Sequence, residues 1–410
     1  MPFHTTTLPN GMQIVGETLP TARSVAVGYY VRTGSRDETT PESGVSHFLE
    51  HMMFKGTPRR TALDVNKDFD RIGASYNAFT SEEVTAYYAA VLPEYLPDAC
   101  DILTDILRPS LRQADFDTEK QVILEEIGMY ADMPSAAAFD HARIKYFKGH
   151  PLGNSVLGTT ESVTALSCEQ MQAYFDRRYS PSNIVAVVAG KFDWQQFVDL
   201  TAKSCGEWKT VKTGREHITP VPNAGGQFAV EKAGVAQEQV LVLSPGPHAA
   251  DPMRYAAGVL SVALGDESGS RMYWALVDPG LADSASCSTD GSEGSGLFAT
   301  FMTCDPDAVP ANLATVQRIL DEVQAVGFTP DELTAAKSKI ASRVVRGSER
   351  PIGRMRALAG SWIYRGETSD PDVELAKYDA VTAADIRAVM DRFPLTENTV
   401  VAYGPRAAIQ

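Results

Sequence analysis

VTALSCEQMQAYFDRRYSPSNIVAVVAG, residues 163–190, recurs in outline as VTAADIRAVMDRFPLTENTVVAYG at residues 381–404. Both segments open with Val-Thr-Ala, continue with a helical pattern, and end in an apolar strand closed by glycine. Asn183 corresponds to Asn398 at an offset of 215, and an Asp-Arg pair recurs at the same offset. The recurrence predicts a duplication, in which two domains share one topology.

A second pair of segments upstream supports the same interpretation. DILTDILRPSLRQADFDTEKQVILEEI resembles RILDEVQAVGFTPDELTAAKSKIASRV, since each predicts a helix, a break, an acidic start and a second helix. The length of 410 residues also exceeds what one hydrophobic core normally supports. The stretch 210–227 is rich in Gly, Pro, Thr and Lys and lies near the midpoint. We therefore expect a first domain at 1–212, a linker at 213–227 and a second domain at 228–410.

Each half mixes alternating strands with amphipathic helices, which predicts an α+β fold. A short turn joins SYNAFT to VTAYYAAV, which favours antiparallel pairing. We expect two homologous domains, each a largely antiparallel β-sheet packed against α-helices. In the first half the strands expected are 12–19, 24–34, 75–80, 84–91 and 183–190, and the helices 43–54, 64–72, 93–107, 115–130 and 167–177.

Composition narrows the classes of function. The net charge of −15 argues against nucleic acid, whose phosphates need a basic surface. No stretch approaches the run of about 18 apolar residues that a membrane helix needs. The five cysteines are odd in number and show no CxxC spacing, which indicates reduced thiols. The N-terminus has no visible signal peptide, so we expect a bacterial cytoplasmic protein, with the mitochondrial matrix as the alternative.

The motif that carries chemistry is SGVSHFLEHMMFKGT, residues 43–57. Ser43 is expected to cap a helix and Gly56 to end it. His47 and His51 are four residues apart, so a helix places both imidazoles on one face. Two such histidines can bind one zinc ion. Glu50 projects toward the same side and could polarise a zinc-bound water as general base.

A catalytic zinc needs a third protein ligand and an open coordination position. The predicted helix TEKQVILEEIGMY offers Glu125 and Glu126. Val122 and Ile123 flank Glu126, and a carboxylate beside an apolar stripe needs a partner such as a metal. Glu119 is seven residues before Glu126 and shares its face. The alternative is a chance His-x-x-Glu-His string on a solvated helix that binds no metal.

The chain resembles peptidase family M16, in particular its mitochondrial-processing-peptidase-like bacterial branch. The resemblance rests on the inverted zinc motif HFLEH and extends over nearly the whole chain. Its other segments are LPNGMQIV, GSRDE, NAFTSEEVTAYYAAV, EKQVILEEIGMYADMP, GHPLGNSVLGT and YSPSNIVAVVAGKF. In that family about 74 residues separate the motif from a distant Glu, and residues 52–125 here number 74.

The resemblance implies a zinc-dependent endopeptidase with a role for each residue of the site. His47, His51 and Glu126 would hold one Zn²⁺, and Glu50 would be the catalytic base. Glu119 would orient a ligand, with an ordinary surface charge as the alternative. Asn77 and Ala78 match the edge strand along which the family binds a peptide as an added strand. The alternative for Asn77 is that it only ends a strand.

The resemblance also implies a second domain without zinc ligands that forms the other wall of a chamber. Many active members carry an Arg and a Tyr in that domain, where this chain has Val277 and Asp283. A partner subunit, or a residue such as Arg271 or Tyr273, could replace them, or the enzyme could be slow. We expect a homodimer, or a heterodimer with another M16 chain. The rival function is a non-catalytic, core-like assembly subunit.

Overall fold

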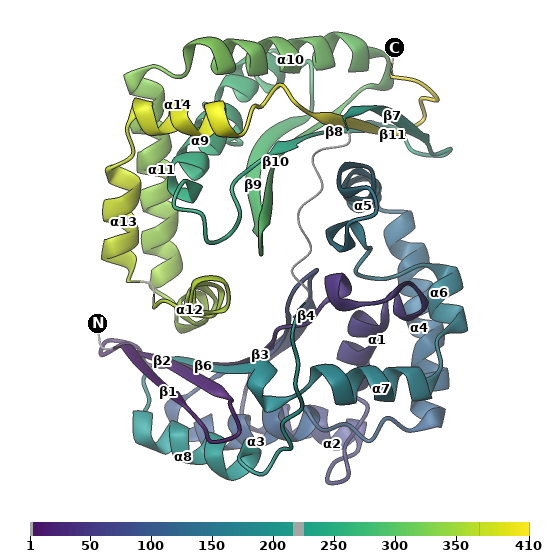
Figure 1. The fold of residues 1–410 in the computed structure, drawn as a ribbon, viewed down its shortest axis with the longest axis vertical. Helices are drawn as coiled ribbons and strands as arrows, with labels where there is room; N and C mark the ends of the chain where they lie inside the picture. The colour runs from purple at the N-terminus through teal and green to yellow at the C-terminus, as the bar shows by residue number, and fades with distance from the viewer. Residues whose placement is uncertain (1–2, 216–224, 369, 410) are drawn as a thin grey trace. The chain divides into compact units, whose positions relative to one another are not determined.

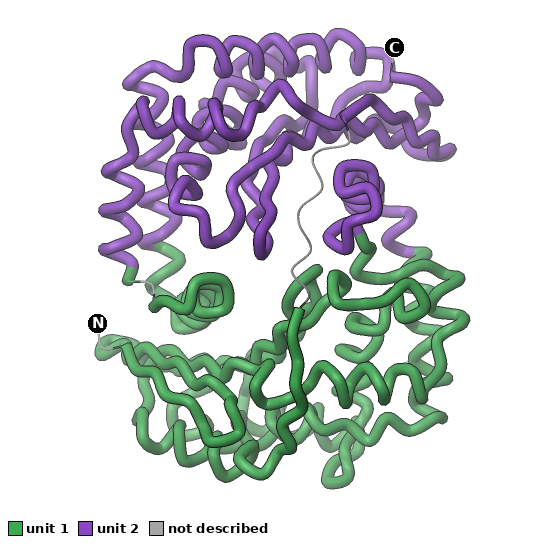
Figure 2. Tube along the Cα trace, viewed as in Figure 1, with its two compact units in different colours: residues 1–128, 154–216, 346–370 green, residues 129–153, 217–345, 371–410 purple. Residues whose placement is uncertain are grey.

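The computed structural model describes residues 3–215, 225–368 and 370–409, so residues 216–224 of the expected linker lie outside the described part. The chain divides into two compact units, coloured green and purple in Figure 2. Unit 1 comprises residues 1–128, 154–216 and 346–370, and unit 2 comprises residues 129–153, 217–345 and 371–410. Each unit contains one sheet and its helices, labelled in Figure 1.

The sheet of unit 1 has the strand order β1-β2-β6-β3-β5-β4. Its strands are β1 (Phe3–Thr7), β2 (Gln13–Thr18), β3 (Val25–Val31), β4 (Ser75–Thr80), β5 (Thr85–Val91) and β6 (Ile184–Gly190). Strands β2 and β6 are parallel, and the other described neighbours are antiparallel. The five strands expected from the sequence are present, and β1 is an addition.

Alternating side chains of this sheet enter two separate cores. Val27 and Tyr29 of β3 face one core, which includes α1, whereas Ala26 and Tyr30 face the other. All described residues of β3 and β6 are buried, as central strands require. The helices are α1 (Val45–Met52), α2 (Ala62–Arg71), α3 (Leu96–Ile106), α4 (Gln113–Ala131), α6 (Thr160–Ala165), α7 (Cys168–Arg178), α8 (Trp194–Cys205) and α12 (Pro351–Arg365).

The sheet of unit 2 has the order β7-β11-β8-β10-β9, and its only parallel pair among the described strands is β7 with β11. Its strands are β7 (Gly226–Glu231), β8 (Glu238–Pro245), β9 (Ser284–Ser292), β10 (Ser295–Cys304) and β11 (Thr399–Gly404). Without β1, the sheet of unit 1 has the same topology, with the parallel pair at the same place. This agreement confirms the predicted fold class and supports the duplication.

The helices of unit 2 follow the same plan. They are α5 (Pro134–Phe147), α9 (Arg254–Gly265), α10 (Val309–Val326), α11 (Pro330–Ser348), α13 (Pro371–Asp379) and α14 (Ala383–Arg392). Ser167 caps α7 and Thr382 caps α14, each accepting a backbone N–H three residues on. These two caps are 215 residues apart, so the repeated sequence signal marks equivalent helix starts.

The compact units differ from the expected boundaries because two helices are exchanged between the halves of the chain. Helix α5 belongs to unit 2, where Ala138, Ala142 and Tyr146 pack beneath β8 and β11. Helix α12 belongs to unit 1, where Met355 and Leu358 pack on the sheet. Each is apolar on the face that it buries, and periodicity alone does not say which sheet covers it. Strand β7 also begins at Gly226, inside the expected linker.

Candidate metal centre

Helix α1 positions the two histidines, and its start differs from the expectation. The N-cap is Gly44 rather than Ser43, and Gly44 has a φ of 91°. A side chain there would meet the Leu157 carbonyl oxygen at 2.6 Å. The carboxylate of Glu38 accepts the backbone N–H groups of Gly44 and Ser46, both at 2.7 Å. A carboxylate distant from the helix in sequence therefore performs the capping expected of Ser43.

Burial raises the pKa of Glu38 to about 7, although the N–H groups of Ser46 and Gly44 oppose this. Helix α1 then ends at Met52, before Gly56, which lies in the following turn with a φ of 111°. Phe48, Leu49 and Met52 are buried, so the helix is anchored on its apolar side. His47 and His51 project together from the remaining face.

His47, His51 and Glu126 converge with one potential ligand atom each, all within 4.8 Å of one another. Nε2 of His47 lies 3.2 Å from Oε2 of Glu126, and Nε2 of His51 lies 3.4 Å from the same oxygen. Two imidazole nitrogens and one carboxylate oxygen form a donor set typical of catalytic zinc. The chemistry and spacing of these side chains therefore fit a single zinc ion.

Helix α4 carries both glutamates of the site on one face. Ile123 is fully buried and fixes the orientation of the helix. Glu126 consequently turns toward α1, whereas its neighbour Glu125 is exposed. Glu119, only 3% exposed, lies two turns before Glu126. The sequence left Glu125 and Glu126 as alternatives, and only Glu126 lies with the histidines.

Glu119 holds the second nitrogen of His51. Its Oε1 accepts from Nδ1 of His51 at 2.9 Å, and its Oε2 contacts Nζ of Lys55 at 2.5 Å. Burial raises the pKa of Glu119, but the hydrogen bonds from His51 and Lys55 outweigh this and lower it. An ionised carboxylate only accepts, so Nδ1 donates to Glu119, and Nε2 is the nitrogen that faces Glu126.

His47 carries a strongly perturbed pKa. Burial lowers the pKa, but hydrogen bonds to Glu126 and Glu50 outweigh it and raise the value to about 9. The hydrogen bond from His47 in turn lowers the pKa of Glu126. A metal that takes the lone pair of His47 must therefore displace a proton.

Glu50 lies beside the histidines and is fixed by the sheet. Its Oε2 accepts the hydroxyl proton of Thr80 at 2.6 Å and lies 3.8 Å from Nδ1 of His47. Thr80 is the last residue of β4, so this bond joins the edge strand to the expected base. The role of Thr80 was not predicted, and neither were those of Lys55 and Glu38. The only signal was that Thr80 shares a strand face with Ala78.

Strand β4, which carries Asn77 and Ala78, lies at the edge of the unit 1 sheet. Ser81 N donates to Val84 O, so the alternation of an antiparallel ladder makes Asn77 and Tyr88 a hydrogen-bonded pair. The backbone groups of Ala78 consequently face the open edge. Oδ1 of Asn77 accepts from the N–H of Ala78 at 2.9 Å. The edge therefore presents backbone groups to which an added strand can bind.

Val277 and Asp283 both lie in unit 2. Val277 ends a π-helical turn, Tyr273–Val277, and Asp283 accepts from Nε2 of Gln237 at 2.7 Å. Arg271 pairs with Glu332 at 2.6 Å and donates to the Gly327 carbonyl. Arg271 is thus engaged within unit 2.

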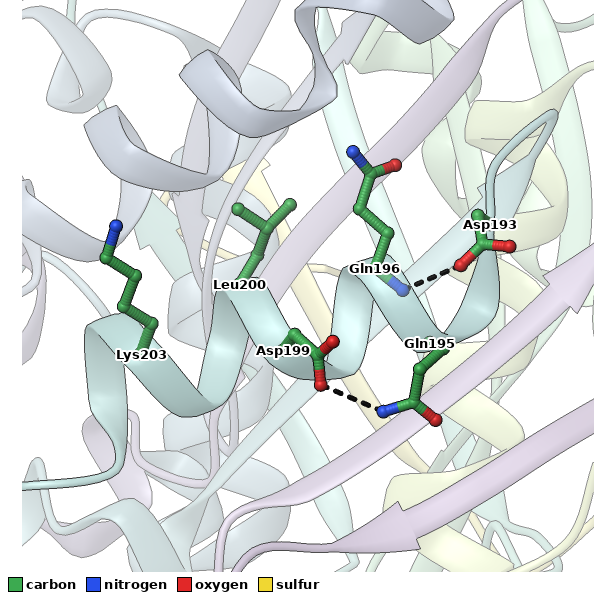
Figure 3. Close-up of a pocket in the computed structure, with 6 residues that line it drawn as sticks. All are labelled: Asp193, Gln195, Gln196, Asp199, Leu200 and Lys203. Atoms are coloured by element: carbon green, nitrogen blue, oxygen red, sulfur yellow. Dashed lines mark hydrogen bonds between the residues drawn. The ribbon is translucent and has the colours of Figure 1, made fainter.

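A surface hollow along α8 is a poor candidate for a functional site (Figure 3). Asp193 accepts the N–H of Gln196, and Gln195 donates to Asp199. These polar groups serve the helix itself, as a cap and an i,i+4 pair. His47, Glu119 and Glu126, whose pKa values are shifted, lie instead on α1 and α4.

Comparison with known proteins places the chain in a family. Residues 13–160 match the model described as insulinase (peptidase family M16), and residues 165–340 match the peptidase M16 inactive domain. The chain belongs to peptidase family M16. An uncharacterized zinc protease of Streptomyces coelicolor is 36% identical to this M16 chain over 394 residues, or 94% of this chain and 85% of the relative. An uncharacterized zinc protease of Mycobacterium leprae is 33% identical over 410 residues, or 98% of this chain and 92% of the relative.

Solved structures agree with the M16 fold. A protease from Helicobacter pylori has a TM-score of 0.91 at 21% identity, covering 98% of this chain and 99% of that one. A putative M16-like peptidase from Alicyclobacillus acidocaldarius has a TM-score of 0.85 at 25% identity, covering 98% of each. These comparisons confirm the predicted family. Among the residues that the structure describes, no helix has the length and apolar character needed to cross a bilayer.

Proposed function

We propose that this M16 chain is a zinc-dependent endopeptidase that hydrolyses peptides or unstructured polypeptides bound along β4. The observation that carries the proposal is the convergence of His47, His51 and Glu126 within 4.8 Å, with Glu50 alongside. Relatives named as zinc proteases support the metal and the activity. His47, His51 and Glu126 would hold the zinc ion.

Zinc, when bound, supplies a Lewis acid that polarises the scissile carbonyl and lowers the pKa of water in its open position. Side chains of the protein transfer the proton and position the reacting groups. Glu50 takes the proton of the attacking water and returns it to the leaving nitrogen. The hydroxyl of Thr80 holds one oxygen of Glu50 and leaves the other able to accept. Glu119 fixes the ring of His51.

Strand β4 would bind the substrate through its backbone. The outward groups of Ala78 would pair with an extended peptide, which suits a peptidase of broad sequence preference. The side chain of Asn77 would exchange its bond to Ala78 N for one to the substrate. Such recognition selects unfolded segments, because the backbone N–H and C=O groups of a folded strand are already hydrogen-bonded to neighbouring strands.

A second candidate is a non-catalytic, core-like subunit, or the zinc-bearing half of a heterodimer. The name of the family model over residues 165–340 and the replacements Val277 and Asp283 favour it. That match does not include the candidate metal centre, however. In a heterodimer, a partner M16 chain would supply the transition-state contacts that Val277 and Asp283 do not make. In a homodimer, a second copy of this chain would supply them.

Zinc content and peptide cleavage of the purified chain test the proposal. We expect one zinc per chain and cleavage that a chelator abolishes. The Glu50→Gln variant should keep its zinc and lose activity by about 10²–10⁴-fold, since it removes the base. Glu125→Gln, an exposed glutamate one residue from Glu126, is the matched control. Cleavage by Glu50→Gln at the wild-type rate, or a chain that takes up no metal, would refute the proposal.

The same assay separates the second candidate. Gel filtration gives the oligomeric state, and activity is measured on the chain alone and mixed with another M16 chain of the same organism. Zinc binding without cleavage by the chain alone, followed by activity in the mixture, would identify the heterodimer. Zinc binding without cleavage in either case would identify the non-catalytic subunit.

A further inference from the structure

The face of the unit 1 sheet opposite α1 is only partly covered by its own helix. Helix α12 packs on β2, β6 and β3, as Figure 1 shows. On this face Ala86 and Tyr88 of β5 share one core with α12, and β4 lies beyond β5 at the open edge. Phe79 of β4 points to this face and is 37% exposed. Within unit 1, the strand at the candidate substrate edge therefore exposes a large side chain on the face of the sheet that α12 covers elsewhere.

One long side chain of α12 reaches Tyr88 of β5, the strand next to this edge. Nη2 of Arg356 donates to the hydroxyl of Tyr88 at 2.5 Å, and its guanidinium lies 4.9 Å from the centre of the Tyr88 ring. Tyr88 is buried at 5% exposure, whereas Arg356 is exposed. The ring thus holds the cation in a fixed place while leaving it in contact with water.

The position of Tyr88 relates this cation to the edge strand. Tyr88 lies directly opposite Asn77 in the ladder, so both side chains are on the same face. The ring of Phe79 lies 6.4 Å from that of Tyr88, on the same face. A strand added beside β4 would place alternate side chains on this face, next to Asn77 and Phe79. Arg356 is the cation held at that face.

Arg356 also differs from three other exposed arginines of unit 1. Arg59, Arg112 and Arg177 each form an ion pair with a carboxylate. Arg356 has no such pair among the residues that the structure describes, and its neighbours there are aromatic. In a chain of net charge −15, a fixed cation without a carboxylate beside it is available to an anionic ligand.

We propose that Arg356 is a specificity-determining residue that selects substrates with an acidic side chain on the α12-facing side of the bound strand. The carboxylate of a substrate Glu or Asp would accept from the guanidinium, while the Tyr88 ring keeps the cation in position. The inference rests on the proposed function, because it presumes that a peptide adds to β4. It specifies which peptides this M16 chain prefers.

The preference for an acidic side chain is measured with pairs of peptides that differ only in Glu or Gln. An unstructured, C-terminally amidated peptide that the wild type cleaves is made with Glu or Gln at each of four positions on either side of the cleaved bond. We expect about tenfold higher kcat/KM for Glu than for Gln at alternate positions on one side, as a charged hydrogen bond predicts. Adding salt should reduce this ratio.

Three variants assign the preference to Arg356. Arg356→Gln should bring the Glu-to-Gln ratio to about one, and Arg356→Glu should favour Lys at the same positions. Arg71→Gln, an exposed arginine on α2, should leave the ratio unchanged. A thermal melt of each variant shows whether the contact with Tyr88 serves stability. A lowered melting temperature with an unchanged Glu-to-Gln ratio in Arg356→Gln would overturn the inference.

Binding separates this inference from the proposed function. The same peptides, labelled with a fluorophore, are titrated into zinc-loaded Glu50→Gln, with and without Arg356→Gln. If the wild type cleaves nothing, the endopeptidase proposal fails, and the binding ratio still tests Arg356. Equal binding of the Glu and Gln peptides, or no binding, would overturn the role of Arg356. Repeating the series with a free C-terminus shows whether a terminal carboxylate is the preferred ligand, which would replace the side chain as the selected group.

Discussion

The two units use equivalent helices for opposite chemistry. In unit 1, Glu126 of α4 meets His47 and His51 of α1. In unit 2, Lys339 and Arg343 of α11 meet the carboxylate of Asp266, which directly follows α9. The repeat aligns α4 with α11 and places Arg343 near the position of Glu126.

In each unit the topology brings the aligned helix to the segment that follows the corresponding strand: α4 meets α1 in unit 1, and α11 meets the end of α9 in unit 2. A carboxylate between two imidazoles forms a site suited to a metal. Two cations around one carboxylate form an ion-pair cluster that is satisfied by protein groups alone. The scaffold therefore provides the meeting point, and the side chains decide whether it holds a metal.

The largest difference in zinc affinity is expected between variants of Glu126 and Arg343. Glu126→Gln removes a charged zinc ligand, so zinc affinity should fall by at least about 100-fold, beyond the effect of losing an outer partner. Arg343→Gln, at the corresponding place in unit 2, should leave zinc affinity unchanged. Competition with a chromophoric chelator measures both. Equal zinc affinity in the two variants would mean that the metal does not bind at this site.

Zinc affinity should also depend on pH. The pKa of His47 is about 9, so between pH 6 and 8 the metal-free chain carries a proton that zinc must displace. Affinity should rise about tenfold per pH unit in this range and level off near pH 9. Chelator titrations at three pH values, corrected for protonation of the chelator, measure the slope. Glu50→Gln removes a group that raises this pKa, so its affinity should level off at lower pH. A flat profile between pH 6 and 8 would contradict the assignment.

A smaller effect is expected at Glu119. Its ionised carboxylate accepts from Nδ1 of His51, and Glu119→Gln weakens that bond. Zinc affinity should fall by about tenfold, the lower end of the range for partners of metal ligands. Unit 2 has the apolar Ala336 at the aligned position. If Glu119 were an ordinary surface charge, its variant would bind zinc as Glu125→Gln does.

The smallest effect should appear in unit 2. Asp266→Asn removes the charge that Lys339 and Arg343 share. Both cations are partly exposed, so the free energy of unfolding should fall by only about 1 kcal/mol. Urea unfolding measures this loss, and zinc affinity should not change. A fall in zinc affinity would show that this cluster affects the metal centre, contrary to the comparison.

The residues of the candidate site could be predicted only in part from the sequence. The four-residue spacing of His47 and His51 encodes a shared helix face, and the 74 intervening residues single out Glu126 only through the family resemblance. From the residues alone, Glu125 and Glu126 were both available, and the apolar neighbours Val122 and Ile123 favoured Glu126. The structure separates them, because the buried Ile123 fixes which face of α4 turns inward.

The sequence by itself determined the duplication, five strands and five helices of the first half and the residues of the zinc motif, because these depend on the periodicity and spacing of the residues along the chain. It did not predict β1, α5, α6 or α8. Only the tertiary structure decided that α5 and α12 are exchanged between the units. It also decided that Glu38 caps α1, that Thr80 holds Glu50 and that Arg356 rests on Tyr88. These contacts join segments distant in the chain, so local sequence patterns do not specify them, and only the packing of the sheets and helices brings them together.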